Sequence, residues 1–301
     1  MSDHDLLWKS LLGAFLPEFL EFVVPSVLDT HKAHQASFLE QEAIADPPKG
    51  RISRLDVIAR VPPIDPARES SRLLMIHVEI ERDYRVKTAW RMWRYYRQLR
   101  LKYEDPVLPI VLFLRGGPRG VERITLREHG AGFEVSAFTF WALGLSKIEA
   151  RDHLEKNALA PALASCMGSK VWSHAERKLR CLERIFDLDV DEARRLMLFD
   201  AVETYVTLKV KQKMSYAEMV EKSARRKEIE VMELTWSGRL QYNARLEGLE
   251  KGRLEGIRLV LKSLLRQRFG SVPPDSLKRL DSIDDSAVLE RIGARILEAE
   301  S

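Results

Sequence analysis

Apolar positions in the first half of the chain change repeatedly between helical and strand spacing. Helical spacing over residues 5–22 predicts an amphipathic helix. Short β-type stretches follow at 37–44, 52–61 and 72–81. The last of these is a nearly continuous apolar run, which is typical of a strand in the middle of a sheet.

The pattern then returns to helical spacing over residues 83–103. Residues 107–114 predict a second buried strand, and segments near 121–127 and 133–139 predict edge strands. Helices that alternate with strands in this way build an α/β layer, with the helices packed on the sheet.

After Trp141 the strand pattern ends, and residues 146–235 predict charged helices, among them 175–186 and 191–213. We therefore expect an α/β fold followed by a mostly helical C-terminal half. The predicted domains are listed in order: an α/β domain at 1–145, a helical extension at 146–236, and a connector with a small helical domain at 237–301.

Glycines recur every four residues in the predicted connector, at Gly248, Gly252 and Gly256. They would share one helix face and permit close packing, but each glycine costs a helix about 1 kcal/mol relative to alanine. We therefore prefer a hinge-like, partly frayed connector. Within the helical module that follows, Asp284 or Asp285 is a predicted N-cap of the last helix.

Composition narrows the class of protein. Of 301 residues, 45% are hydrophobic and 31% are charged, which indicates an ordered, soluble protein, and the net charge of +4 only weakly favours an anionic partner. The two cysteines, Cys166 and Cys181, form neither a disulfide framework nor a zinc-binding pair. An acidic N-terminus and an interrupted apolar stretch at 11–28 predict a cytoplasmic protein with no membrane partner.

Acidic residues in the strand predicted at 72–81 are the first candidates for chemistry. Side chains alternate along a strand, so His77, Glu79 and Glu81 share one face. Two like charges this close repel one another, and burial removes the water that would screen them. A bound divalent cation relieves both effects.

A third carboxylate, Asp56, lies on the preceding predicted strand among apolar residues. Sequential strands usually pair, so Asp56 can lie beside Glu79. Asp56, Glu79 and the carbonyl of Ile80 would supply the oxygen ligands that Mg²⁺ or Mn²⁺ takes. Such a metal would activate a water and neutralise charge while a phosphodiester is cleaved.

The helix predicted at 83–103 is strongly basic. Between Arg82 and Lys102 the chain has eight Lys or Arg residues and one acid. Arg91, Arg94 and Gln98 are predicted on the face opposite the core, where they would contact DNA phosphates. Trp90 and Trp93 are predicted core residues, and Tyr95 remains open between packing and function.

Three segments together resemble a known family: Leu55-Asp56-Val57, Ile76-His77-Val78-Glu79-Ile80-Glu81 and Arg91-Met92-Trp93-Arg94-Tyr95. They are similar to the recombination-promoting nuclease / putative transposase group of the PD-(D/E)XK nuclease superfamily, over roughly residues 1–140. The tail from about Gly248 resembles a helical domain of unknown function that is often fused to these proteins. The resemblance implies a restriction-endonuclease-like mixed sheet flanked by helices, and a metal-dependent DNA endonuclease linked to recombination or mobile elements.

The resemblance assigns Asp56 and Glu79 as metal ligands, and at Glu81 the chain departs from the family pattern. The superfamily has lysine there, which orients the water and stabilises transition-state charge, and this group often has glutamine. Glu81 instead resembles the second carboxylate of E-x-E restriction endonucleases, which acts as a base or metal partner. Arg82, Arg85 or Lys87 would supply the displaced positive charge.

Several alternatives remain open. Asp56 and Glu79 could face water or pair with Arg54 and Arg60, His77 could be a hydrogen-bonded structural residue, and Glu40 or Glu42 could approach the metal. The basic run 225–227 fits a solvated helix face. Two further functions compete with the nuclease: an inactive nucleic-acid binder on a degenerate nuclease fold, and an assembly protein that binds a partner or itself through residues 146–301.

Overall fold

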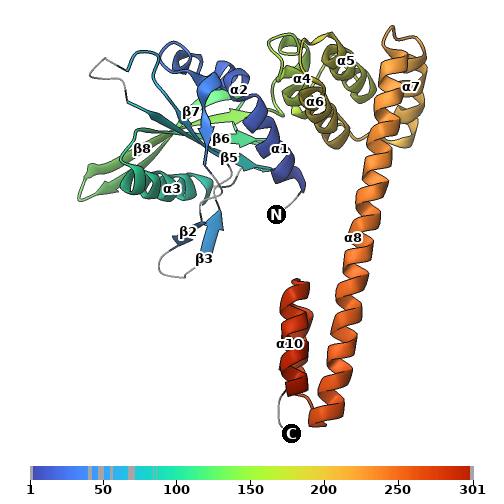
Figure 1. Cartoon of the computed structure of the whole chain (residues 1–301). Coiled ribbons are helices and arrows are strands. Elements are labelled where there is room, and N and C mark those ends of the chain that lie inside the picture. The colour runs from blue at the N-terminus through green and yellow to red at the C-terminus, as the bar shows by residue number, and fades with distance from the viewer. Residues whose placement is uncertain are drawn as a thin grey trace. The chain divides into compact units, whose positions relative to one another are not determined.

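The protein is described by a computed structural model, which covers residues 3–39, 43–46, 51–54, 57–66, 72–83, 85 and 87–298. The chain divides into two compact units, Met1–Glu230 and Val231–Ser301. The first unit holds a sheet with helices, and the second unit is helical (Figure 1).

The first unit contains a mixed six-stranded sheet, with strand order β1-β4-β5-β6-β8-β7, part of which is labelled in Figure 1. Strand β4 is antiparallel to both of its neighbours, β1 and β5. Strands β5, β6 and β8 are parallel to one another, and β7 is antiparallel to β8. The predicted α/β class is thus confirmed. The bounds are β1 Ser37–Phe38, β4 Val57–Val61, β5 Leu74–Glu81, β6 Val107–Phe113, β7 Gly120–Gly130 and β8 Phe133–Gly144.

The strand predicted at 72–81 is confirmed as β5, with β4 on one side of it and β6 on the other. Residues 75–80 are all buried, so both faces of this strand are covered. A strand covered on both faces reads as a continuous apolar run, which explains why the pattern identified it.

Two predicted strands are each divided between two sheets. The stretch 52–61 contributes to β3 (Arg51–Arg54), which pairs with β2 (Ala43–Asp46) in a separate two-stranded sheet, and to β4, which pairs with β5. The stretch 37–44 likewise contributes to β1 and to β2. Apolar spacing does not report which strand a segment pairs with, so the prediction merged these elements.

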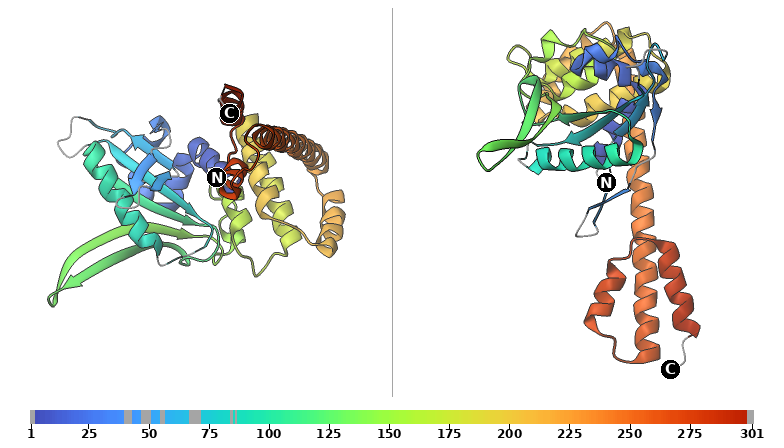
Figure 2. Two further views of the ribbon diagram at one scale, coloured as in Figure 1. Left: turned by 90° about the horizontal axis from the view of Figure 1, so that it is seen from below. Right: turned by 90° about the vertical axis from the view of Figure 1, so that its left-hand side faces the viewer.

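The strands β7 and β8 form a long hairpin that extends beyond the rest of the sheet (Figure 2). The predicted edge strand at 133–139 is only the first part of β8, whose last four residues pair with β6. The connecting residues Ala131 and Gly132 have φ of 51° and 85°, as in the two-residue turns that match strand twist. At the tip, Phe133 and Val135 are exposed.

Helices cover both faces of the sheet, with α3 (Lys87–Tyr103) on one face and α1 (Asp3–Ala14) and α2 (Leu16–Val23) on the other (Figure 2). The single helix predicted at 5–22 is therefore wrong. Its pattern is interrupted by Pro17, which lies in the first turn of α2, where a missing N–H costs nothing, whereas within a continuous helix it would remove a hydrogen bond.

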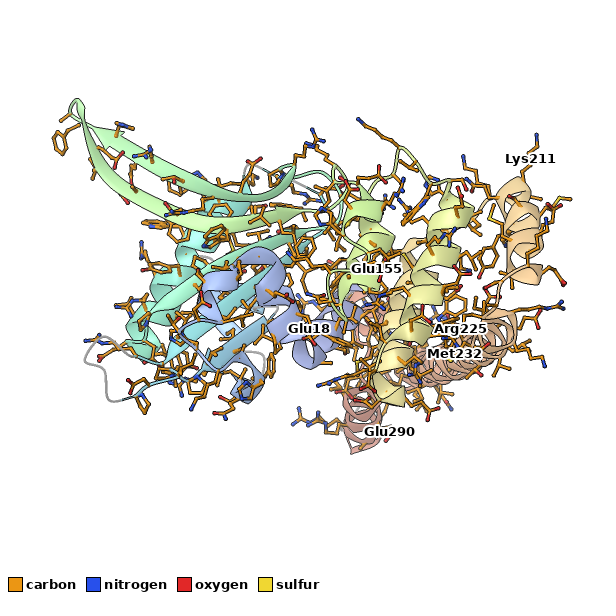
Figure 3. All side chains as sticks on the ribbon, turned by 90° about the horizontal axis from the view of Figure 1, so that it is seen from above. Glu18, Glu155, Lys211, Arg225, Met232 and Glu290 are labelled. Atoms are coloured by element: carbon orange, nitrogen blue, oxygen red, sulfur yellow. The ribbon has the colours of Figure 1, made fainter. Side chains whose placement is uncertain are left out.

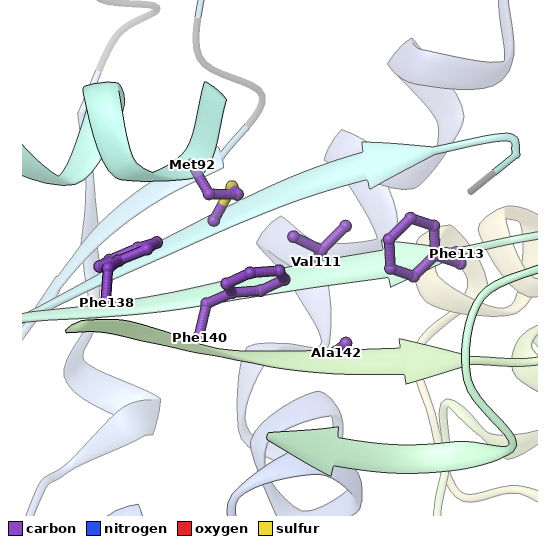
Figure 4. Close-up of a cluster of buried hydrophobic side chains, with 6 residues drawn as sticks. All are labelled: Met92, Val111, Phe113, Phe138, Phe140 and Ala142. Carbon is purple, nitrogen blue, oxygen red and sulfur yellow. The ribbon is translucent and has the colours of Figure 1, made fainter. Parts of the chain in front are cut away.

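Side chains on alternate positions of the sheet build the core beneath α3. Val111 and Phe113 of β6 pack with Met92 of α3 and with aromatic side chains of β8 (Figure 4). Ile58 and Met75 pack with Tyr95 and Leu99 of α3. Even positions of β4 and odd positions of β5 and β6 therefore face α3.

The helices predicted for 146–235 are confirmed, with one difference. The stretch 191–213 holds two helices, α6 and α7, and Asp191 caps the first. The basic run at 225–227 is a charged surface, since Arg225 (labelled in Figure 3) pairs with Asp187 and Glu228. The bounds are η1 Pro25–Val27, η2 Ala33–Gln35, η3 Ala150–Asp152, α4 Ala160–Cys166, α5 His174–Asp187, α6 Glu192–Tyr205 and α7 Val210–Glu221.

The second unit is built from most of α8 (Arg226–Phe269), α9 (Pro274–Asp281) and α10 (Ser286–Glu298). The frayed connector is wrong, because 226–269 is one continuous helix that includes all three spaced glycines. Strong helix formers, mainly Leu, Glu, Lys and Arg, separate them and offset their cost.

Asp285 accepts a hydrogen bond from the Val288 N–H, so its predicted capping role is confirmed. The buried core of this unit is Leu254, Leu261, Leu280, Leu289 and Ile296.

None of the helices in the described residues has the length and apolarity that crossing a bilayer requires.

A buried glycine provides a test of the sheet. A Cβ added at Gly144 would lie 2.1 Å from the backbone oxygen of Pro118. We expect Gly144→Ala to lower the free energy of unfolding by about 3 kcal/mol, at the upper end for overpacking, because backbone must move. In Gly13→Ala, the added Cβ meets nothing within 4 Å, and α1 should gain up to about 1 kcal/mol. Urea unfolding measures both, and equal stability of the two variants would contradict this packing.

Candidate active site

Three polar side chains of β5 face α3, as predicted from strand alternation. His77 is completely buried and Glu79 is 4% exposed, although both lie on a central strand. Met75, on the same face, packs against α3. Ionisable groups are rarely this buried unless they are paired, so this part of the strand is a candidate functional site.

His77 holds the carboxylate of Glu79. Its Nε2 lies 3.0 Å from Oε1 of Glu79, and because an ionised carboxylate only accepts, Nε2–H is the donor. The imidazole also contacts the ring of Tyr95 edge-on, with centroids 5.7 Å apart. The structure therefore supports the structural reading of His77 and a packing role for Tyr95.

Arg91 of α3 reaches both carboxylates of the strand. Its Nη2 lies 3.4 Å from Oε2 of Glu79 and forms a closer ion pair with Oε1 of Glu81. The prediction that Arg91 lies opposite the core is therefore wrong. Thr88 and Tyr95, three residues before and four after it, are both buried, so this side of the helix faces the sheet.

The other residues predicted to contact DNA differ in position. Arg94 is exposed, as expected for a phosphate contact. Gln98 is half-buried with a buried Oε1, so its predicted place on the solvent face is wrong. Trp93 packs on the core cluster, whereas Trp90 is 44% exposed and is not the core residue predicted.

Asp56, the second predicted metal ligand, lies outside the described residues, as do Glu40 and Glu42. The residue after it, Val57, pairs with Val78, and Ile58 pairs with His77. Arg60, an alternative partner for the acidic residues, instead pairs with Asp105 at 3.2 Å.

The backbone of Ile80 is directed toward β4. The backbone carbonyl of Glu81 accepts a hydrogen bond of 2.9 Å from the N–H of Leu114, the residue after β6. Backbone groups of successive residues in a strand point to opposite neighbours. The peptide groups of Ile80 therefore point to the side on which Val57 begins β4.

Among the described residues, no group of three or more His, Cys, Asp or Glu side chains could hold a metal. The donors that remain at the site are the carboxylates of Glu79 and Glu81 and the carbonyl of Ile80. Oxygen donors of this kind suit Mg²⁺ or Mn²⁺, so their chemistry fits the predicted metal once Asp56 is added from the sequence.

A cavity of about 470 Å³ lies on the opposite face of the sheet and was not anticipated. Ile80 and Arg82 line it, so Arg82 does not supply a positive charge to Glu79 and Glu81. The buried Arg177 of α5 also lines it. The burial of Arg177 could have been predicted from the sequence, because Cys181 and Ile185 follow it at helical spacing on the same apolar face.

The two cysteines are free thiols. Burial raises the pKa of Cys166 and of Cys181 to about 12. A thiol with such a pKa is a poor nucleophile near neutral pH.

Comparison of the chain with protein-family models, with curated proteins and with solved structures found no match.

Proposed function

We propose that this protein is a metal-dependent DNA endonuclease that hydrolyses phosphodiester bonds. The observation that carries the proposal is the buried carboxylate of Glu79, held by His77 on a central strand beside Glu81 and Arg91. A buried carboxylate beside a second, half-buried one is costly unless cations share the site. A site of this composition suits a divalent ion and a phosphate group.

The order of elements supports a restriction-endonuclease-like sheet. The antiparallel pair β4 and β5 is followed by α3 and then by β6, which is parallel to β5. The assignment of Asp56 as a metal ligand rests on the sequence. It is two residues before Ile58, which pairs with His77, and Glu79 is two residues after His77. A continuous register would make Asp56 and Glu79 neighbours on the α3 face.

In this proposal Asp56, Glu79 and the Ile80 carbonyl would hold Mg²⁺ or Mn²⁺. A bound metal would lower the pKa of water and neutralise charge on the scissile phosphate. Glu81 accepts the proton of the attacking water at a carboxylate oxygen. Arg91 supplies the positive charge that a lysine would otherwise provide, because its Nη2 already lies between the two carboxylates. Arg94 contacts the DNA backbone.

Metal dependence and the Asp56 assignment are tested together. We expect the purified chain to cleave DNA with Mg²⁺ or Mn²⁺ and to stop when a chelator is added. Asp56→Asn should reduce cleavage by about a hundredfold or more, because the amide loses the ligand charge. Asp189→Asn, at an exposed position before α6, is the matched control and should cleave normally. Full cleavage by Asp56→Asn would refute the assignment.

One observation favours a second candidate, a DNA-binding protein without catalysis. Arg91 already pairs with Glu79 and Glu81, and a guanidinium can neutralise such carboxylates without a metal. This candidate predicts DNA binding that weakens steeply with added salt. It also predicts no cleavage with any divalent metal.

A further inference from the structure

The cavity of about 470 Å³ lies at the carboxyl ends of β5 and β6. Ile80 and Leu114 contribute from the sheet side, and Ser165, His174 and Thr204 contribute from α4, α5 and α6. Its volume lies within the range of small-molecule sites, about 300–1,000 Å³. All of its lining residues belong to the first unit.

The charge of the lining is positive. Arg82, Arg115 and Arg177 line the cavity together with His174, and none of the described residues that line it is acidic. Hydroxyl groups complete the wall, among them those of Ser165 and Thr207. Guanidinium and hydroxyl donors are the groups that proteins use to bind phosphate oxygens.

Arg177 is the strongest indication that the cavity binds an anion. It is 8% exposed, and its Nη1 donates to the carbonyl of Met167. Its Nε is buried and has no hydrogen-bond partner among the described residues. Glu149 interacts with Arg177 electrostatically, but its carboxylate accepts hydrogen bonds from Ser169 Oγ and the Lys170 N–H. A buried guanidinium in such surroundings is costly until an anion reaches it.

The ionisation of His174 agrees with positive charge in the cavity. Burial, followed by the charges of Arg177 and Lys209, lowers the pKa of His174. Burial alone lowers the pKa of Arg177, and the charges around that residue act in the other direction. The repulsion that disfavours a protonated His174 favours an anion at the same place.

We propose that this cavity binds a phosphate monoester, carried either by a free nucleotide or by the end of a nucleic-acid strand. Arg82 and Arg115 are exposed, so they lie where a ligand enters. Arg177 meets the ligand at the buried end. The binding does not require a metal or cleavage by the carboxylates, which face the other side of the sheet.

Calorimetric titration of the full chain in the presence of a chelator tests the cavity. We expect AMP and inorganic phosphate to bind, and adenosine, which lacks the phosphate, to show no measurable binding. The double variant Arg82→Gln/Arg115→Gln should weaken AMP binding at least about tenfold, since each charge-assisted bond is strong. Arg180→Gln, on the same helix as Arg177 but outside this cavity, should bind as the native chain does.

Arg177→Gln gives a second measurement, with folding checked by circular dichroism. A folded variant that binds AMP as tightly as the native chain would overturn the role of Arg177. Adenosine binding as tight as that of AMP, or an unchanged affinity in the double variant, would overturn the proposal as a whole.

Competition distinguishes the two sources of phosphate. A short oligonucleotide with a terminal phosphate is added to the AMP complex, and the same oligonucleotide with a terminal hydroxyl is the control. Displacement of AMP by the phosphorylated strand alone assigns the cavity to a strand end. Displacement by neither strand assigns it to a free nucleotide.

Discussion

Replacing Glu79 with glutamine is expected to abolish DNA cleavage while the chain stays folded. The amide keeps the shape of the carboxylate, and its Oε1 can still accept the bond from His77 Nε2. It removes a negative charge beside the half-buried Glu81, and Arg91 keeps its ion pair with Glu81, so the chain should stay folded. It also removes a ligand charge for the metal, and we expect a loss of about a thousandfold or more in cleavage rate.

The control for this variant is Glu122→Gln, at an exposed position on β7. It should cleave DNA at the native rate, and both variants should bind DNA with similar salt dependence. Cleavage by Glu79→Gln within tenfold of the native rate would remove Glu79 from the chemistry. The rate with saturating metal, together with a thermal melt of each variant, decides the outcome.

Replacing Arg91 with methionine should cost the protein both stability and activity. Glu79 and Glu81 would lose the guanidinium that they share. Breaking a buried ion pair from one side costs roughly 3–5 kcal/mol, and Arg91 is 34% exposed, so we expect the lower end, about 3 kcal/mol. Urea unfolding in a chelator measures this loss.

The response of Arg91→Met to metal shows whether a divalent ion can replace the guanidinium of Arg91 in neutralising Glu79 and Glu81. If a divalent ion binds beside Glu79, added Mg²⁺ should raise the melting temperature of Arg91→Met more than that of the native chain, by linkage. Arg97→Met, an exposed position on the same helix that covers Trp93, should lose no more than about 1 kcal/mol. An Arg91→Met variant as stable as the native chain would contradict the ion pairs described at this site.

The sequence predicts most reliably where burial itself sets the pattern. The strand β5 is apolar at nearly every position because both of its faces are covered, and the shared face of His77 and Glu79 follows from alternation. The helices predicted after residue 146 were confirmed for the same reason, since α5 carries an apolar stripe along its length.

An apolar pattern does not show which strands pair with one another or how far a long side chain extends. Arg91 has the polar character of a surface residue, yet its side chain is long enough to extend from a helix face to the acidic end of a strand. The stretch 52–61 has one strand-like composition but contributes to two sheets. Partners distant in sequence decide both outcomes, as they do for the cavity around Arg177.

The exposed tip of the β7–β8 hairpin is a convenient place to modify the protein. Ala131 and Gly132 form a tight turn far along the hairpin from the residues that pair β8 with β6. Exposed turns tolerate inserted sequence better than buried backbone does. A fluorophore or an affinity peptide attached there would report on the protein without altering the acidic residues of β5 or the arginines that line the cavity on the other face of the sheet.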